Sequence, residues 1–117
     1  MSLLLFSTDL MTASRVEGAA ARAGVEFLST VGIDHAAAQT GSGDVTLVLV
    51  DLTSASLDVA QLVERIRSVG TDGAAIVAFG PHVQKERLAA AREAGCDEVL
   101  TRGQFFAELD AIVQRTG

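Results

Sequence analysis

The fold is decided by the stretch Val45-Thr-Leu-Val-Leu-Val-Asp-Leu-Thr-Ser-Ala-Ser-Leu-Asp58 together with the segment 59–69 that follows it directly. Residues 45–50 are apolar apart from Thr46 and rich in β-branched side chains, which is typical of a strand covered on both faces of a parallel sheet. In segment 59–69, apolar residues recur every three or four positions, which predicts a helix with one buried face. A strand of this kind that leads directly into a helix indicates an α/β architecture.

Outward from this stretch, short apolar runs alternate with helical periodicity five times. The predicted strands are Leu3 to Ser7, Val25 to Ser29, Val45 to Val50, Ala74 to Phe79 and Glu98 to Thr101. The predicted helices are Met11 to Ala23, Ile33 to Gln39, the segment 59–69, a helix through Ala94 with Pro81 just ahead of it or in its first turn, and a last helix with the apolar face Phe105, Leu109, Ile112 and Val113. Repeated strand–helix units imply right-handed crossovers and a parallel sheet between layers of helices.

Local signals predict where these elements begin and end. We expect Asp9 to cap the first helix and Ser54 or Ser56 to cap the third, because short polar side chains accept hydrogen bonds from free amides of a first turn. Gly24 and Gly95 stand where the first and fourth helices are expected to end. The stretch 40–44 is predicted to be a plain turn.

Composition narrows the class of protein. The chain has 117 residues, 49% of them hydrophobic and 21% charged, which predicts one domain over 1–117 with a real core. The net charge of −6 disfavours nucleic acid as a partner. Cys96 is the only cysteine, which excludes an intramolecular disulfide and favours a cytoplasmic location. The apolar run 1–6 is too short for a membrane span or a signal peptide and predicts a strand.

Two motifs carry a resemblance to a known family. The segment Leu47-Val-Leu-Val-Asp-Leu-Thr-Ser-Ala-Ser-Leu-Asp58, continuing to Leu62-Val-Glu-Arg-Ile-Arg67, resembles the receiver domain of two-component response regulators. The segment Ala94-Gly-Cys-Asp-Glu-Val-Leu-Thr-Arg102 is similar to the "AGADDYLTKP" of that family. The resemblance spans essentially the whole chain and implies the flavodoxin-like, CheY-like fold. That fold is a three-layer doubly wound α/β sandwich whose five-stranded parallel sheet has the order 2-1-3-4-5.

The resemblance also assigns positions, and the chain departs from most of them. Asp51 falls at the phosphoacceptor position. Ser7 and Thr8 stand at the positions of the family's Mg²⁺-binding acidic pair, and Asp9 follows one place later. Gly80 stands where the family has its switch hydroxyl, and Val99 where it has its switch aromatic residue. Arg102 replaces the family's lysine. Mg²⁺ prefers carboxylate oxygens, and phosphoryl transfer depends on positioning and charge neutralisation. We therefore expect no metal, no cofactor, no catalytic residue and no autophosphorylation.

Some residues admit two interpretations. Asp51 is either a retained phosphoacceptor or a strand-end carboxylate bound by backbone amides or paired with Arg102, and we favour the second. Helical spacing places one of Phe105 and Phe106 in the core and leaves open whether the other is exposed. Cys96 is expected to be a small buried side chain at the start of the fifth strand, with a pKa raised by its acidic neighbours.

The sequence thus predicts a protein-interaction module in signal transduction and not an enzyme. The expected contact surface is the fourth helix, fifth strand and fifth helix, facing a signalling partner or a second copy in a homodimer, with no membrane contact. Two alternatives stay open. One is a single-domain response regulator phosphorylated at Asp51 by a cognate histidine kinase. The other is a small-ligand-binding or enzymatic domain on a flavodoxin-like sheet.

Overall fold

A computed structural model describes residues 1–41, 44–54, 57–69 and 74–116. The strands are β1 (Ser2–Phe6), β2 (Glu26–Thr30), β3 (Val45–Asp51), β4 (Ala75–Gly80) and β5 (Glu98–Thr101). The helices are α1 (Leu10–Ala23), α2 (Ile33–Gly41), α3 (Val59–Ser68), α4 (Lys85–Glu93), α5 (Arg102–Ala107) and α6 (Leu109–Thr116). No helix in these ranges has the length and apolar character needed to cross a bilayer.

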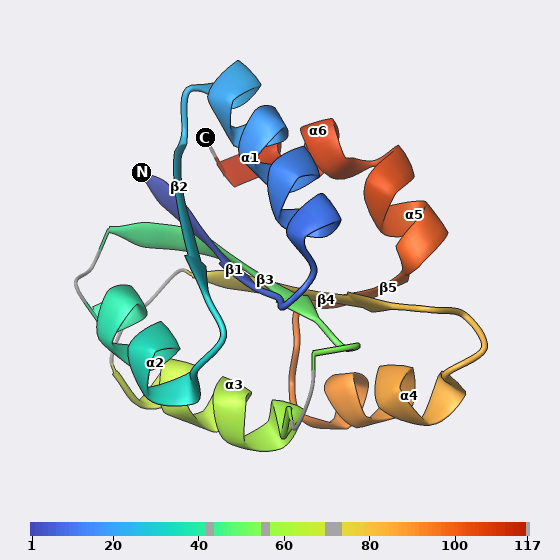
Figure 1. Ribbon diagram of the computed structural model, residues 1–117. Helices are drawn as coiled ribbons and strands as arrows, with labels where there is room; N and C mark the ends of the chain where they lie inside the picture. Colours follow the sequence, from blue (N-terminus) through green and yellow to red (C-terminus); the bar gives the residue numbers. More distant parts are fainter. Residues whose placement is uncertain (42–43, 55–56, 70–73, 117) are drawn as a thin grey trace.

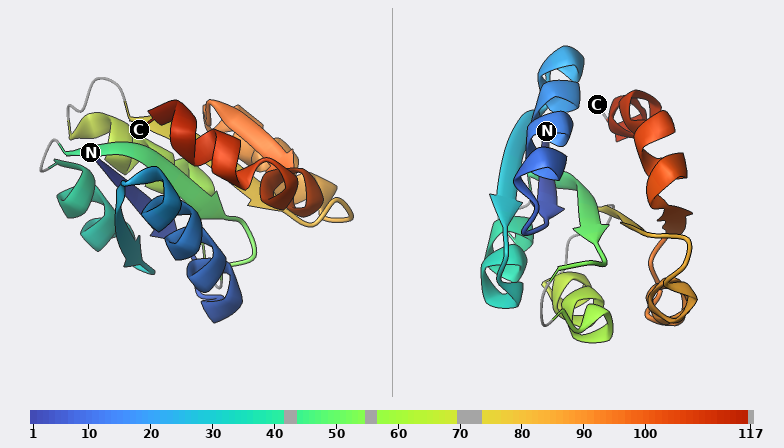
Figure 2. Two further views of the ribbon diagram at one scale, coloured as in Figure 1. Left: turned by 90° about the horizontal axis from the view of Figure 1, so that it is seen from above. Right: turned by 45° about the vertical axis from the view of Figure 1, so that its right-hand side comes forward.

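The sheet has five parallel strands in the order β2-β1-β3-β4-β5, which confirms the predicted fold class. Helices α1, α5 and α6 cover one face, and α2, α3 and α4 cover the other (Figure 1). The two layers of helices are also separated in the right-hand view of Figure 2. The central strands β1 and β3 are almost wholly buried, as their apolar sequences require.

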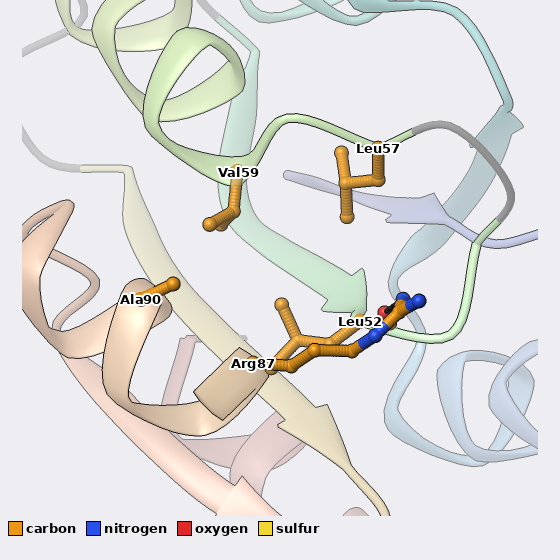
Figure 3. Close-up of a pocket in the computed structure, with 5 residues that line it drawn as sticks. All are labelled: Leu52, Leu57, Val59, Arg87 and Ala90. Atoms are coloured by element: carbon orange, nitrogen blue, oxygen red, sulfur yellow. Dashed lines mark hydrogen bonds between the residues drawn. The ribbon is translucent and has the colours of Figure 1, made fainter. Parts of the chain in front are cut away.

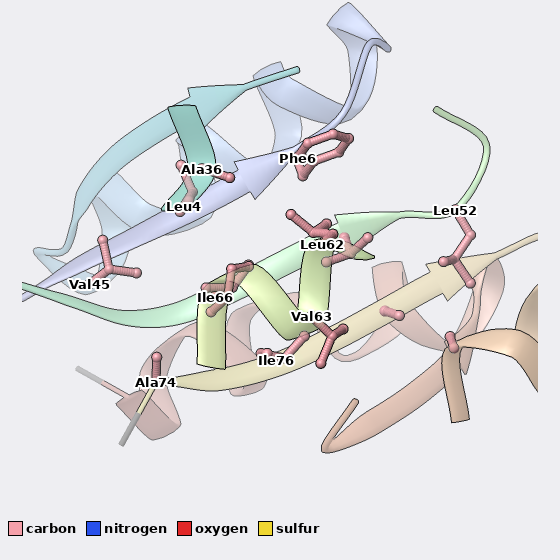
Figure 4. Close-up of a cluster of buried hydrophobic side chains, with 14 of the residues drawn as sticks. Leu4, Phe6, Ala36, Val45, Leu52, Leu62, Val63, Ile66, Ala74 and Ile76 are labelled. Carbon is pink, nitrogen blue, oxygen red and sulfur yellow. The ribbon is translucent and has the colours of Figure 1, made fainter. Parts of the chain in front are cut away.

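Alternate side chains of each strand enter one of two hydrophobic clusters on opposite faces of the sheet. The cluster beneath α2, α3 and α4 contains Leu4, Phe6, Leu62 and Ile76 among others (Figure 4). The cluster beneath α1, α5 and α6 is centred on aromatic contacts. There the ring of Phe105, itself fully buried, stacks on that of Phe79 with a centroid distance of 3.8 Å.

Both predicted caps of the first helix are confirmed. Asp9 caps α1, and its carboxylate accepts a hydrogen bond from the Met11 amide at 3.1 Å. Gly24 follows α1 with φ of 71°, a left-handed conformation that favours glycine. The predicted cap of the third helix is wrong, because α3 begins at Val59 and Asp58 immediately precedes it. The Asp58 side chain, not that of Ser54, accepts from the Gln61 amide at 3.1 Å, and Ser56 lies outside the described residues.

Three other boundaries differ from the predicted ones. Helix α4 begins at Lys85, because Pro81 first forms a turn in which its carbonyl accepts from the Gln84 amide. The segment predicted as one last helix forms two helices, α5 and α6, which are separated at Glu108. Helix α2 includes Thr40 and Gly41, where a turn was predicted, and residues 42 and 43 of that turn lie outside the described ranges.

Candidate functional site

The positions assigned by the sequence analysis gather at the carboxyl edge of the sheet. Ser7 follows β1, Asp51 ends β3, Gly80 ends β4 and Arg102 follows β5. Strand register places Phe6 beside Val50, so Ser7 and Asp51 continue side by side. This edge is where parallel α/β sheets position the side chains that bind ligands.

The carboxylate of Asp51 is enclosed and fully hydrogen-bonded. Asp51 has no exposed surface. One carboxylate oxygen accepts from the Ser7 hydroxyl at 2.7 Å, and the other accepts from the Thr53 amide at 3.0 Å and the Thr53 hydroxyl at 2.6 Å. The residue at the first acidic-pair position therefore donates a hydrogen bond to Asp51 instead of supplying a second negative charge. Thr8, at the second of those positions, is exposed.

The loop after β3 closes over the end of β4, where the family's switch hydroxyl would stand. The Leu52 amide donates to the Phe79 carbonyl at 2.9 Å, and the Leu52 side chain is buried. A Cβ atom on Gly80 would lie 3.3 Å from the Leu52 Cβ, closer than ordinary contact. Arg87 of α4 holds the loop from outside, because its guanidinium donates to the Leu52 carbonyl at 2.5 Å (Figure 3).

We predict that Gly80→Ser lowers the free energy of unfolding by about 1 to 3 kcal/mol, since the added Cβ must displace the packed Leu52 side chain. The measurement is urea unfolding followed by circular dichroism. Gly103→Ser is the matched control, because nothing lies within 4 Å of a Cβ at Gly103. Equal stability of the two variants would contradict a close contact between Leu52 and Gly80.

Of the two partners considered for Asp51, a backbone amide is found, that of Thr53, and Arg102 is not, because Arg102 binds Asp9. Its guanidinium donates to the Asp9 carboxylate at 3.1 Å and to the Thr12 hydroxyl at 3.2 Å. Asp9, one place beyond the family's acidic pair, is the N-cap of α1 and lies within reach of Arg102, whereas Asp51 is enclosed by Ser7 and Thr53. The Thr12 hydroxyl first, then the Met11 amide and Arg102, hold the pKa of Asp9 below its usual value.

The donor set does not fit the Mg²⁺ ion that the fold family implies. The carboxylate of Asp9 is occupied by Met11, Thr12 and Arg102, and that of Asp51 by Ser7 and Thr53. Across the described ranges, no three acidic, histidine or cysteine side chains form a group that could hold a metal. A divalent cation at Asp51 would have to displace the bound hydroxyls and would find no carboxylate at the two acidic-pair positions, Ser7 and Thr8.

The remaining candidates take structural positions. Val99 packs partly buried against the cluster beneath α2, α3 and α4. Cys96 lies just before β5, half-buried, and burial followed by the charge of Asp97 raises its pKa to about 11. Phe106 is half-buried, with the Arg15 guanidinium 3.9 Å from its ring centroid.

Sequence reasoning missed three residues that shape this site, namely Thr53, Leu52 and Arg87. A signal for Thr53 exists, because an Asp side chain commonly accepts from the backbone amide two residues further on. The close contact of Leu52 with Gly80 and the reach of Arg87 to the loop join separate elements. No local pattern predicts them.

No family model matches the chain. No curated protein matches its sequence either. Its fold does match solved structures of receiver domains. A superposition on the receiver domain of a Pseudomonas aeruginosa sensor histidine kinase, crystallised with magnesium in its active-site cleft, gives a TM-score of 0.81. It covers 98% of this chain and 95% of that one at 19% identity.

Two further structures agree. A putative response regulator from Chloroflexus aurantiacus gives a TM-score of 0.80, with 22% identity over 98% of this chain and 95% of that one. The Brucella abortus protein NtrX gives 0.79, with 19% identity over 99% of this chain and 27% of that longer one. These superpositions show that the chain has the receiver fold, and at identities this low they show the fold alone.

Proposed function

We propose that the chain is a receiver-like protein-interaction domain that works without Mg²⁺-dependent phosphorylation of Asp51. The observation that carries this proposal is the enclosure of the Asp51 carboxylate by the Ser7 hydroxyl and by the amide and hydroxyl of Thr53. A phosphoryl donor needs an accessible nucleophilic oxygen beside a metal and a free cation. Here the carboxylate has no exposed surface, and Arg102 is engaged by Asp9.

Signal output in this proposal passes through contacts and not through a chemical step on a substrate. We infer that the contact surface is formed by α4, β5 and α5. Strand β5 is short and at the edge of the sheet, which leaves one row of its backbone groups without a strand partner. The net charge of −6 favours a protein over a nucleic acid on this surface, and the lone Cys96 is compatible with work in the cytoplasm.

The test is the intact mass of the full chain after incubation with acetyl phosphate and Mg²⁺. We expect the mass to stay that of the unmodified chain, because the Asp51 oxygens are bound internally. A receiver that phosphorylates itself is treated in parallel as a positive control, and Asp51→Asn is the negative control. A stoichiometric phosphoryl adduct on the wild-type chain that is missing from Asp51→Asn would contradict the proposal.

One feature favours a second candidate function, a response regulator phosphorylated by a cognate histidine kinase. The chain keeps an aspartate at the end of β3. A kinase could open the loop after β3 as it docks. The same mass measurement with the kinase present separates the two functions, because only the second predicts an adduct at Asp51.

A further inference from the structure

Two adjacent apolar side chains on the first turn of α1 have no cover. Leu10 is 85% exposed and Met11 is 75% exposed. We call this pair the apolar tip. Arg15 lies four residues beyond Met11, on the same side of the helix. It stacks on Phe106 and forms no ion pair with any described residue.

A groove runs between α3 and α4 on the other face of the molecule. Two cavities of about 240 and 510 Å³ share the lining residues Leu57, Val59 and Ala90, and so form one groove. Figure 3 shows these side chains around the hollow, with Arg87 at one end. Small side chains at Ala60 and Ala94 also line the groove. Apart from Arg87, Asp58 and Glu93, the residues that line the groove are apolar.

The two surfaces are complementary in charge as well as in polarity. The groove is flanked by the carboxylates of Asp58 and Glu93. Neither forms an ion pair within the part of the chain that the structure describes. When the apolar tip binds in the groove, Arg15 lies one helical turn away and can pair with these carboxylates. A helix that fills the groove should carry exposed apolar side chains and, one turn further on, a cation. Helix α1 of this chain meets both requirements with Leu10, Met11 and Arg15.

We propose that the chain associates with itself head to tail, with the apolar tip of one copy seated in the α3–α4 groove of the next. Because α1 and the groove lie on opposite faces of the sheet (Figure 1), the contact joins two different surfaces and can repeat. The product is a chain or a ring of copies. The groove shares helix α4 with the proposed α4–β5–α5 surface. The contact does not depend on the state of Asp51, so its failure would leave the proposal for Asp51 untouched.

Association is expected to be weak. A contact of two side chains and one ion pair is smaller than the roughly 800 Å² per partner of a stable interface. Sedimentation velocity should therefore be measured from about 10 μM to about 1 mM protein, the range in which weak contacts appear. We expect the average mass of the wild-type chain to rise across this range.

Variants of each surface identify the contact. Leu10→Ser/Met11→Ser removes the apolar tip, and Ala90→Gln fills the groove, so each alone should stay monomeric. Val31→Ser changes an exposed apolar residue elsewhere, and Ala89→Gln makes the same change as Ala90→Gln beside the groove. Both controls should associate like the wild-type chain. All of these positions are exposed, so circular dichroism should show an unchanged fold.

Mixing the two defective variants is the decisive step. The intact tip of Ala90→Gln can enter the intact groove of Leu10→Ser/Met11→Ser, and neither remaining end can add a further copy. We expect a mixture in equal amounts to form a dimer and nothing larger. A wild-type chain that stays monomeric throughout the range, or association that survives both substitutions, would overturn the proposal.

Discussion

Replacing Asp51 by Ala is expected to lower the free energy of unfolding by about 2 to 3 kcal/mol, because three hydrogen bonds to a buried carboxylate are lost. The loss is partly offset, since the substitution also removes a buried charge that has no cation in contact. Asp51→Asn should lower the free energy of unfolding by less. The Asn side-chain oxygen can still accept from Thr53, and its amide group can donate to the Ser7 hydroxyl, which then accepts instead of donating. Urea unfolding at pH 7 measures both variants.

The sign of this effect distinguishes an enclosed carboxylate from a metal site that lacks its ion. In a metal site, neighbouring carboxylates repel one another, and removal of one stabilises the fold. Here Ser7 stands beside Asp51 and donates to it. Asp34→Ala is a control, because Asp34 is exposed and its pair with Arg65 should contribute no more than about 1 kcal/mol. An Asp51→Ala variant more stable than the wild-type chain would contradict our description of the site.

The largest loss of stability is expected from Phe105→Ala, about 3 to 5 kcal/mol, because the substitution opens a cavity in the cluster beneath α1, α5 and α6. Phe105 is fully buried and its ring lies nearly parallel to that of Phe79. It also joins the short helix α5 to β4. The measurement is again urea unfolding, with the midpoint and the slope fitted separately.

Phe106→Ala is the matched control for this substitution. Phe106 is the next residue on the same helix, but it is half-buried and its ring is partly covered by Arg15. We expect it to lose much less stability than Phe105→Ala. Equal losses would mean that α5 does not present Phe105 to the core in the way the structure shows.

The strands and the sheet order could be predicted because their signals are strong and local or carried by the family resemblance. The apolar run of β3 predicts a strand buried on both faces, and Asp9 predicts the start of α1. The division between α5 and α6 has no such signal, because apolar residues keep their helical spacing across Glu108. Pro81 marks the start of α4 only roughly, because it suits the turn that precedes the helix as well as a first helical turn.

The candidate site was predicted in its positions but only partly in its hydrogen bonds: a backbone amide binds Asp51 as expected, and Arg102 does not. The sequence indicates that Ser7, Asp51 and Arg102 meet at one edge of the sheet, and they do. The sequence alone cannot indicate which acidic side chain forms the ion pair with Arg102. The shift of an acidic residue by one place to Asp9 puts that carboxylate at the N-cap of α1, where Thr12 and Arg102 both reach it. A choice of partner among side chains from separate elements depends on distances that only the folded chain sets.

The most direct test of a closed Asp51 site is an amide NMR titration of the wild-type chain with Mg²⁺ and then with beryllofluoride, a phosphoryl mimic. We expect the Ser7 and Thr53 signals to stay in place at every concentration, because their side chains and the Thr53 amide already occupy the carboxylate oxygens. Saturable shifts of both signals that disappear in Asp51→Asn would show a working metal and phosphoryl site, and would contradict it.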